Sequence, residues 1–442
     1  MTRKFILSAF LAIATSAPAL AGGLMTNTNY HIAFDRMFAR GASTEIDAAY
    51  SNPAGLAWTH EGWQLSLNFQ KPWQHRNIEA VTAAGSQKFE GKASAPIVPA
   101  LFASYKKGDW AFSTMIGIVG SGGFVEYKDG VPMFNMLMSG MLSQMGITPG
   151  AYTIDSEMKG KQYIYGGQFN VTRKFGSYFS AAVGIRANYY DGYYRGHVKA
   201  GGHAALGDLT NLELDVDQRG WGFAPIISAN YHRGSLTLSA RYEFRTKIET
   251  ENKTNMLNAD LGTGLKTLLT QTNPAALQTI ATSLGGYTAE YQDGIKTRYD
   301  MPALFVAAVG YEFTDKFRGT LEYHFFDDKN AQMAGDRQKE LTHGTHEILA
   351  GVEYDINDKF TVSCGGQRTD YGLSDGYQKD TSFACDSYSL GLGGAWNINE
   401  KLRLNVSYFC SLYSDYNKPT SYGSEIYSRT NHVVGVGIDY KF

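Results

Sequence analysis

The last twelve residues of the chain, Asn431-His432-Val433-Val434-Gly435-Val436-Gly437-Ile438-Asp439-Tyr440-Lys441-Phe442, decide the fold class. Every second side chain from Val434 to Phe442 is apolar, and the residues between them are small or charged. Residues two apart point to the same face of a strand, so one face is apolar and the other is not. This pattern recurs along the chain with little predicted helix, which favours lipid as the apolar medium. A sheet that spans lipid closes into a barrel because every backbone polar group must be paired within it.

The same alternation predicts further strands at residues 63–70, 236–245, 317–325 and 402–409. In each of these segments, apolar side chains occupy one face and Gln, Ser, Asn, Arg or Glu side chains occupy much of the other. A soluble β-sandwich shows the same alternation and is the alternative fold.

Six short polar breaks mark the places where strands reverse. They lie at residues 106–109, 173–176, 232–235, 314–316, 356–359 and 398–401. We interpret them as periplasmic turns, because the connections between them are longer and more variable, as extracellular loops are. Each turn joins one hairpin, and the first and last strands complete the sheet. The prediction is an all-β, antiparallel transmembrane barrel of about fourteen strands.

The first residues indicate export. Arg3 and Lys4 precede the apolar run 5–14, and Ala19-Leu20-Ala21 offers small residues to a signal peptidase. The apolar run is too short to span a bilayer, and no later stretch approaches about 18 apolar residues. We therefore expect a signal peptide at residues 1–21 and a protein of the outer membrane of a Gram-negative bacterium.

Composition agrees with this class. The 49 Gly, 29 Tyr, 24 Phe and 6 Trp residues suit tight turns and aromatic girdles at the membrane interfaces. A mean hydropathy of -0.28 is compatible with a barrel, because half of each strand faces a wet lumen. The formal net charge of -2 argues against a nucleic-acid partner. Nothing in the sequence indicates a cofactor or a metal, and we expect a monomer.

Three cysteines in an exported chain allow at most one internal disulfide. Cys364 and Cys385 are equidistant from the predicted turn near Ser374-Asp375. The alternation places their side chains on different faces of the sheet, so a disulfide between them would need a bulge. Whether they are bridged stays open. Cys410 has the lipid-facing parity.

Two long connections carry helical patterns and predict partly helical extracellular loops. In the first, apolar residues at helical spacing form a Met-rich face that suits a hydrophobic ligand of variable shape. They are Met133, Leu137, Met138, Met141, Leu142 and Met145. The second predicts a helix from about Met256, stopped and restarted at Asn273-Pro274, and continuing to about Leu284. The alternative role for both is simple packing on the barrel mouth.

The residues ahead of Trp63 show no strand alternation and are rich in small residues and turn formers. A barrel of about fourteen strands leaves an interior too wide for its own side chains to fill. We therefore expect residues 22–61 to form a plug inside a barrel of residues 62–442.

Residues 41–57, with Asn52, Pro53 and Ala54 placed just before the first strand, resemble the FadL family of outer-membrane transporters of long-chain fatty acids and aromatic hydrocarbons. Residues 372–377 and 430–437 are also similar to that family. The resemblance implies a fourteen-stranded barrel, an N-terminal hatch that bears an Asn-Pro-Ala motif, ligand capture among the outer loops, and lateral exit at an inward kink in the third strand. It implies passive, ligand-gated transport and no enzyme activity.

The expected third strand contains Gly120, Gly122 and Gly123. Clustered glycines in a strand mark a bulge or kink without reference to any family. They are our candidates for the lateral opening, and close packing against the plug is the alternative. Lumen-parity arginines at positions 186, 241, 245, 318 and 403 are expected to pair with Glu243, Glu322 or Glu353.

Three other functions are alternatives, and one of them is an adhesin or a purely structural barrel. A general diffusion porin fits the charged lumen but not a plug or a Met-rich loop. A metal or hydrolytic site would rest on His343, His346 and Glu347, the tightest histidine cluster, whose spacing matches no strong motif.

Overall fold

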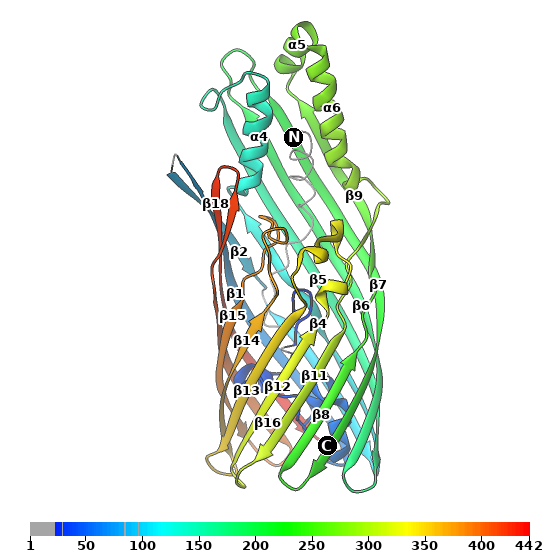
Figure 1. Cartoon of the computed structure of the whole chain (residues 1–442). Helices are drawn as coiled ribbons and strands as arrows, with labels where there is room; N and C mark the ends of the chain where they lie inside the picture. The colour runs from blue at the N-terminus through cyan, green and yellow to red at the C-terminus, as the bar shows by residue number, and fades with distance from the viewer. Residues whose placement is uncertain (1–22, 29, 84, 96) are drawn as a thin grey trace.

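The computed structural model describes residues 23–28, 30–83, 85–95 and 97–442, and their strands form one closed antiparallel sheet (Figure 1). The predicted signal peptide lies outside these residues. No helix among the described residues is long and apolar enough to cross a membrane.

The sheet is built from 18 strand segments in the described part of the chain. They are β1 (Gly62–Thr82), β2 (Gly85–Ser94), β3 (Val98–Lys107), β4 (Trp110–Tyr127), β5 (Thr153–Phe175), β6 (Phe179–Gly201), β7 (Thr210–Arg233), β8 (Leu236–Glu243), β9 (Glu249–Leu261), β10 (Lys296–Arg298), β11 (Leu304–Glu312), β12 (Phe317–Phe326), β13 (Thr345–Asp355), β14 (Phe360–Asp370), β15 (Ser387–Asn397), β16 (Leu402–Tyr413), β17 (Tyr416–Thr420) and β18 (Gly423–Lys441).

Four barrel strands are interrupted and appear as two segments each, namely β2 with β3, β8 with β9, β10 with β11, and β16 with β17. The described segments therefore make fourteen barrel strands. The first strand, β1, pairs with the last, β18, from Gln64 opposite Lys441 to Thr82 opposite Gly423, and this pairing closes the barrel. The predicted fold class and all six predicted turns are confirmed.

The two faces of each strand differ as the alternation predicts. On β1, Trp63, Leu67 and Phe69 are 56%, 43% and 44% exposed on the outside, whereas Gln64 and Asn68 are buried inside. Apolar side chains on the outside and polar ones within are the reverse of a soluble fold, so the β-sandwich alternative is wrong. Aromatic pairs such as Trp63 with Tyr105 and Phe360 with Trp396 lie near the ends of strands, as girdle residues do.

The N-terminal segment, residues 23–61 with position 29 left out, lies inside the barrel near the end that carries the short turns (Figure 1). It contains α2 (Ile32–Met37), α3 (Ala48–Ser51) and the 3-10 helix η1 (Pro53–Trp58). Nearly all of its side chains are buried. Polar groups of the wall help to hold it: the Asn68 Oδ1 atom accepts a hydrogen bond from the Ile32 amide at 3.0 Å. The segment therefore fills the space that a wide barrel leaves.

Helices occupy the loops at the opposite end (Figure 1). α4 (Pro132–Gln144) follows β4, while α5 (Thr263–Thr272) and α6 (Pro274–Thr288) follow β9. The Asn273 side chain caps α6 by accepting from the Ala276 amide at 3.1 Å, and Pro274 begins the helix, as predicted. The expected helix from Met256 is wrong at its start, because residues 256–261 extend β9 and pair with β7. Short 3-10 helices complete the loops: η2 (Ala289–Tyr291), η3 (Asp328–Asn330) and η4 (Ala334–Glu340).

Replacing Leu321 with Arg should destabilise the barrel, because this β12 side chain is 53% exposed on the lipid-facing side. A cation on that face costs about 2–4 kcal/mol near the bilayer midplane. Thr320→Arg is the matched control, since Thr320 lines the polar interior one residue away. Urea unfolding of vesicle-inserted protein measures both, and equal losses for the two variants would contradict the assignment of faces.

Candidate functional site

The third barrel strand, β4, is irregular along the predicted glycine cluster. Its pairing with β3 ends with Ile116 opposite Leu101, and its pairing with β2 begins at Phe124 opposite Ser94. On its other edge, the register with β5 shifts twice between Ile118 and Gly123. Within the described residues, the wall between the second and third barrel strands is therefore interrupted along residues 117–123.

Backbone geometry explains why glycines stand there. Gly123 has a φ of 98°, a conformation that residues with a Cβ rarely adopt. At Gly120, an added Cβ would lie only 2.5 Å from the Met25 carbonyl oxygen, because the N-terminal segment passes close by. Gly122 lies in the same irregular stretch.

The N-terminal segment covers the lumen side of this irregular stretch. The Asn27 amide donates to the Val119 carbonyl at 3.1 Å, and the Asn27 side chain donates to the Ile118 carbonyl at 3.2 Å. The Tyr30 hydroxyl also donates to Val119 at 3.0 Å. Carbonyl groups left without a strand partner by the kink thus gain donors from the N-terminal segment.

The Asn52-Pro53-Ala54 motif attaches the N-terminal segment to the neighbouring strands β6 and β7 of the wall. The Asn52 side-chain amide donates to the Ser43 carbonyl at 3.0 Å and to the Asn230 side chain at 2.7 Å. Pro53 begins η1, where its missing N–H and fixed φ are tolerated. The Ala54 carbonyl accepts from the Ser180 hydroxyl at 2.6 Å. The motif is a buried turn bonded to β6 and β7.

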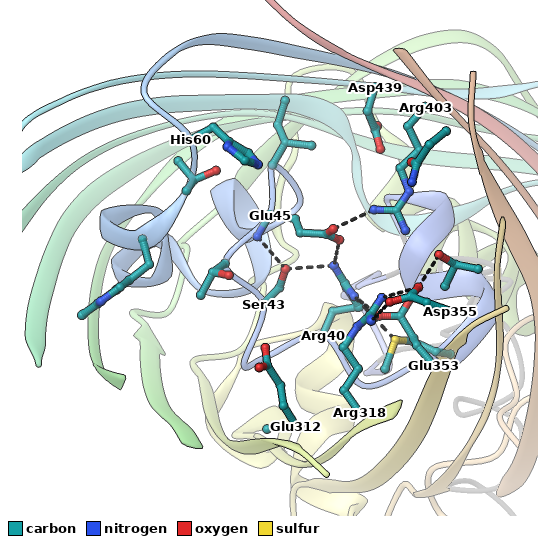
Figure 2. A pocket seen from close by; sticks show the side chains of 18 of the residues that line it. Arg40, Ser43, Glu45, His60, Glu312, Arg318, Glu353, Asp355, Arg403 and Asp439 are labelled. Atoms are coloured by element: carbon teal, nitrogen blue, oxygen red, sulfur yellow. Dashed lines mark hydrogen bonds and ion pairs between the residues drawn. The ribbon is translucent and has the colours of Figure 1, made fainter. Parts of the chain in front are cut away.

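A charged network fixes the turn-side end of the N-terminal segment to the wall (Figure 2). Arg40 pairs with Asp47 at 2.6 Å, with Glu45 at 2.7 Å and with Glu353 of β13 at 3.2 Å. Glu45 also pairs with Arg403 of β16 at 2.6 Å. Burial opposes the charge on Arg40, but Asp47, Glu45 and Glu353 together raise the pKa of its guanidinium. These groups border a polar cavity of about 880 Å³ below the N-terminal segment.

The other lumen arginines follow the sequence prediction in part. Arg186 and Arg241 both pair with Glu243, and Arg318 pairs with Glu353 at 3.1 Å. Arg403 instead pairs with Glu45, and Arg245 pairs with Asp300.

Sequence reasoning missed a basic pair near the outer end. Arg76 of β1 stands directly opposite Arg429 of β18, and both side chains are buried. Arg76 lies 4.5 Å from the centre of the Phe383 ring, and Arg429 lies 4.6 Å from that of Tyr413. Strand parity with Gln74 would have placed Arg76 in the lumen.

The Met-rich helix α4 packs into an apolar region at the outer end, which we call the outer apolar region. Met138 and Leu142 are buried there, and the other four predicted side chains pack against it partly buried. They are Met133, Leu137, Met141 and Met145. A small cavity of about 50 Å³ remains between α4, β5, β6 and β9, lined by apolar residues that include Phe134, Met158, Val198 and Leu257.

The side chains of the alternative histidine site do not point toward one common position. Glu347 is buried in the lumen against His324 at 2.9 Å, whereas the neighbouring His346 contacts Tyr323 at 2.7 Å. Among the described residues, no group of three His, Cys, Asp or Glu side chains could hold a metal ion. Cys364, Cys385 and Cys410 are all free thiols.

No protein-family model and no curated protein matches the chain. Solved structures do match. A FadL homologue from Pseudomonas aeruginosa aligns at a TM-score of 0.67 and 14% identity, covering 95% of this chain and 100% of the other. The toluene transporter TodX from P. putida aligns at 0.59 and 12%, covering 90% and 95%. The toluene transporter TbuX from Ralstonia pickettii aligns at 0.52 and 12%, covering 90% and 93%.

The apolar outer face, the closed sheet and the filled interior define an outer-membrane β-barrel. The alignments extend over almost the whole chain. Its fold is that of the FadL and TodX channels, so the predicted resemblance is confirmed at the level of fold.

Replacing Asn52 with Ala should loosen the N-terminal segment, because two buried hydrogen bonds are lost and the Asn230 side chain loses its donor. The expected cost is about 1–3 kcal/mol. Liposomes that contain the variant should leak small polar solutes, and the N-terminal segment should be cut faster by protease. The control is Ser51→Ala, since Ser51 bonds only within α3, to the Asp47 carbonyl. A variant as tight as the wild type would show that the motif does not hold the segment closed.

Proposed function

We propose that this protein carries hydrophobic compounds, such as long-chain fatty acids or aromatic hydrocarbons, passively across the outer membrane. The proposal rests chiefly on the interrupted stretch of β4 at residues 117–123, a candidate lateral opening in a barrel whose axis is filled. The toluene transporters TodX and TbuX share the fold. A hydrophobic solute gains little from a water-filled pore, so exit through the wall into lipid is the favourable route.

Capture is assigned to the outer apolar region. α4 presents six Met and Leu side chains, and methionine adapts its shape to varied apolar ligands. The cavity beside Phe134 is small, so a ligand would enter by displacing these side chains rather than by filling a preformed site.

The axial route is opposed by the N-terminal segment and its ionic network. Arg36, Arg40 and Arg318 all pair with Glu353, so three cations converge on one buried carboxylate. Breaking a buried pair costs about 3–5 kcal/mol, which favours a segment that stays in place. This argues against the alternative of a general diffusion porin, which needs an open aqueous channel.

Arg76 and Arg429 favour an anionic ligand. Their like charges face each other across two strands, and a carboxylate between them would relieve the repulsion. Guanidinium groups also bind carboxylates with two parallel hydrogen bonds. A fatty acid offers this group and an uncharged arene does not, so the pair separates the two substrate classes.

Replacing Gly122 and Gly123 with Val should straighten β4 and reduce uptake of a hydrophobic substrate, because Val does not adopt the φ of Gly123. Uptake of a radiolabelled fatty acid into proteoliposomes measures the effect. Gly167→Ala on β5 is the control, since a Cβ there meets no atom within 4 Å and the residue lies outside the interrupted stretch. Wild-type uptake by a correctly folded double variant would reject the lateral route.

Arg429→Gln should weaken uptake of a fatty acid and leave uptake of toluene unchanged, whereas Arg76 also donates to the Phe383 carbonyl at 2.6 Å and is kept intact. One lost charge-assisted hydrogen bond corresponds to about 1.5–3 kcal/mol, or roughly a 10- to 100-fold weaker affinity. Competition between the two substrates in the same vesicles gives the comparison. Parallel losses for both substrates would assign Arg429 a structural role instead.

A further inference from the structure

The loop between β14 and β15, residues 371–386, folds into the barrel and is here called the inner loop. Its ends are joined by the Tyr371 amide, which donates to Asp386 at 2.9 Å. Within it, Gln378 and Ala384 exchange two hydrogen bonds, at 2.8 and 3.1 Å. Arg337 from η4 donates to the Tyr377 carbonyl at 2.6 Å. The inner loop is thus a bonded structure rather than an open coil.

Its two sides face different apolar regions. Phe383 and Cys385 belong to the outer apolar region, together with Met138 and Leu142 of α4. Tyr371, Tyr377 and Ala384 belong instead to a second buried cluster, which contains Leu24 and Met25 of the N-terminal segment and Val119 of the β4 kink. Residues 383–385 therefore form a layer between the place of capture and the place of exit.

One contact joins this layer to the capture helix. The Asp380 Oδ2 atom accepts from the Met133 amide at 2.7 Å, in the first turn of α4. The other Asp380 oxygen accepts from the Tyr427 hydroxyl of β18 at 2.8 Å. A movement of the inner loop away from its present position would therefore pull on α4 or break this contact.

The Asp380 contact includes a shared proton. The Tyr427 hydroxyl lies 2.8 Å from Asp380 and 2.6 Å from Glu425. A hydroxyl donates one proton, so both contacts are hydrogen bonds only when one of the two carboxyl groups is also protonated and donates to the phenol oxygen. Burial, together with the Glu425 charge, raises the pKa of Asp380 to about 7.

The surroundings of Asp380 are acidic and phenolic, with two lysines. α4 contributes only the Met133 backbone amide. The titratable groups that interact electrostatically with Asp380 are Glu425 and Tyr427 of β18, Tyr422, Lys418 of β17, Lys379 of the inner loop, and Tyr127 of β4. Lys418 lies 3.8 Å from Glu425 and offsets part of its charge.

We propose that the inner loop is a gate between the outer apolar region and the interior, and that the proton shared by Asp380 and Glu425 latches the gate to β18. The inference rests on the proposed transport function. When the proton leaves to solvent, two carboxylates face one hydroxyl, and their repulsion weakens the contact between the inner loop and β18, while the Met133 amide still bonds the charged Asp380. The raised pKa means that the latched state is fully stabilised at pH values below the ordinary carboxyl range, and that this stabilisation is lost as the pH rises through about 7.

The test is uptake of toluene, a substrate whose own charge does not change, into proteoliposomes at pH 6 and pH 8. Wild-type uptake should rise with pH, by at most about tenfold per unit, the limit for one linked proton. Asp380→Asn keeps an acceptor for the Met133 amide but cannot titrate, so the rise should vanish. Glu425→Gln removes the like charge that raises the pKa of Asp380, so it should make the rise smaller, and it serves if the first variant does not fold.

Asp375→Asn is the matched control, because Asp375 is an exposed carboxylate of the same loop that bonds Tyr416 at 2.9 Å. It should keep the wild-type response. A pH response that persists in Asp380→Asn, or is absent from the wild type, would overturn the gate. Wild-type vesicles with no uptake above empty ones would instead refute the proposed transport function, and the gate with it.

Discussion

The pairing of backbone polar groups in lipid is the constraint on which the rest of this structure depends. It forces the strands to close, with β1 bonded to β18, and it leaves a wide interior for the N-terminal segment. The same constraint acts at the kink of β4. Where the wall is interrupted, Ile118 and Val119 receive donors from Asn27 and Tyr30 of the N-terminal segment. The interruption of β4 and the N-terminal segment are thus linked, because the segment supplies hydrogen-bond donors where the strand pairing is broken.

Charge and apolar surface are separated along the barrel axis. The turn-side end holds the ionic network around Arg40 and Glu353, whereas the loop end holds the outer apolar region around α4. The basic pair Arg76 and Arg429 lies at the loop end as well, against the aromatic rings of Phe383 and Tyr413. The interior is therefore mainly apolar and aromatic at the loop end and mainly charged at the turn-side end.

The sequence by itself determined the strands, the turns and the class of fold. In a strand, side chains alternate between the two faces, so the apolar side chains of residues 434–442 show which face contacts lipid. A few neighbouring residues are enough to reveal this pattern because the strand period is two. The irregularity of β4 and the turn at Asn-Pro-Ala could also be predicted from the sequence. A glycine permits a positive φ and a proline fixes φ, and both are properties of single residues. The start of α5 could not be predicted in this way. Residues 256–261 carry an apolar pattern that fits a helix or a strand, and they form a strand because they pair with β7.

Only the tertiary structure decided which distant residues meet. Arg76 and Arg429 are separated by almost the whole chain, and closure of the barrel alone places them opposite each other. Asp380 reaches α4 and Tyr427 because the inner loop folds inward, and no local pattern predicts the direction in which a loop folds. The physical reason is that a strand carries its own periodicity in its sequence, whereas a contact between loops depends on the packing of the whole barrel.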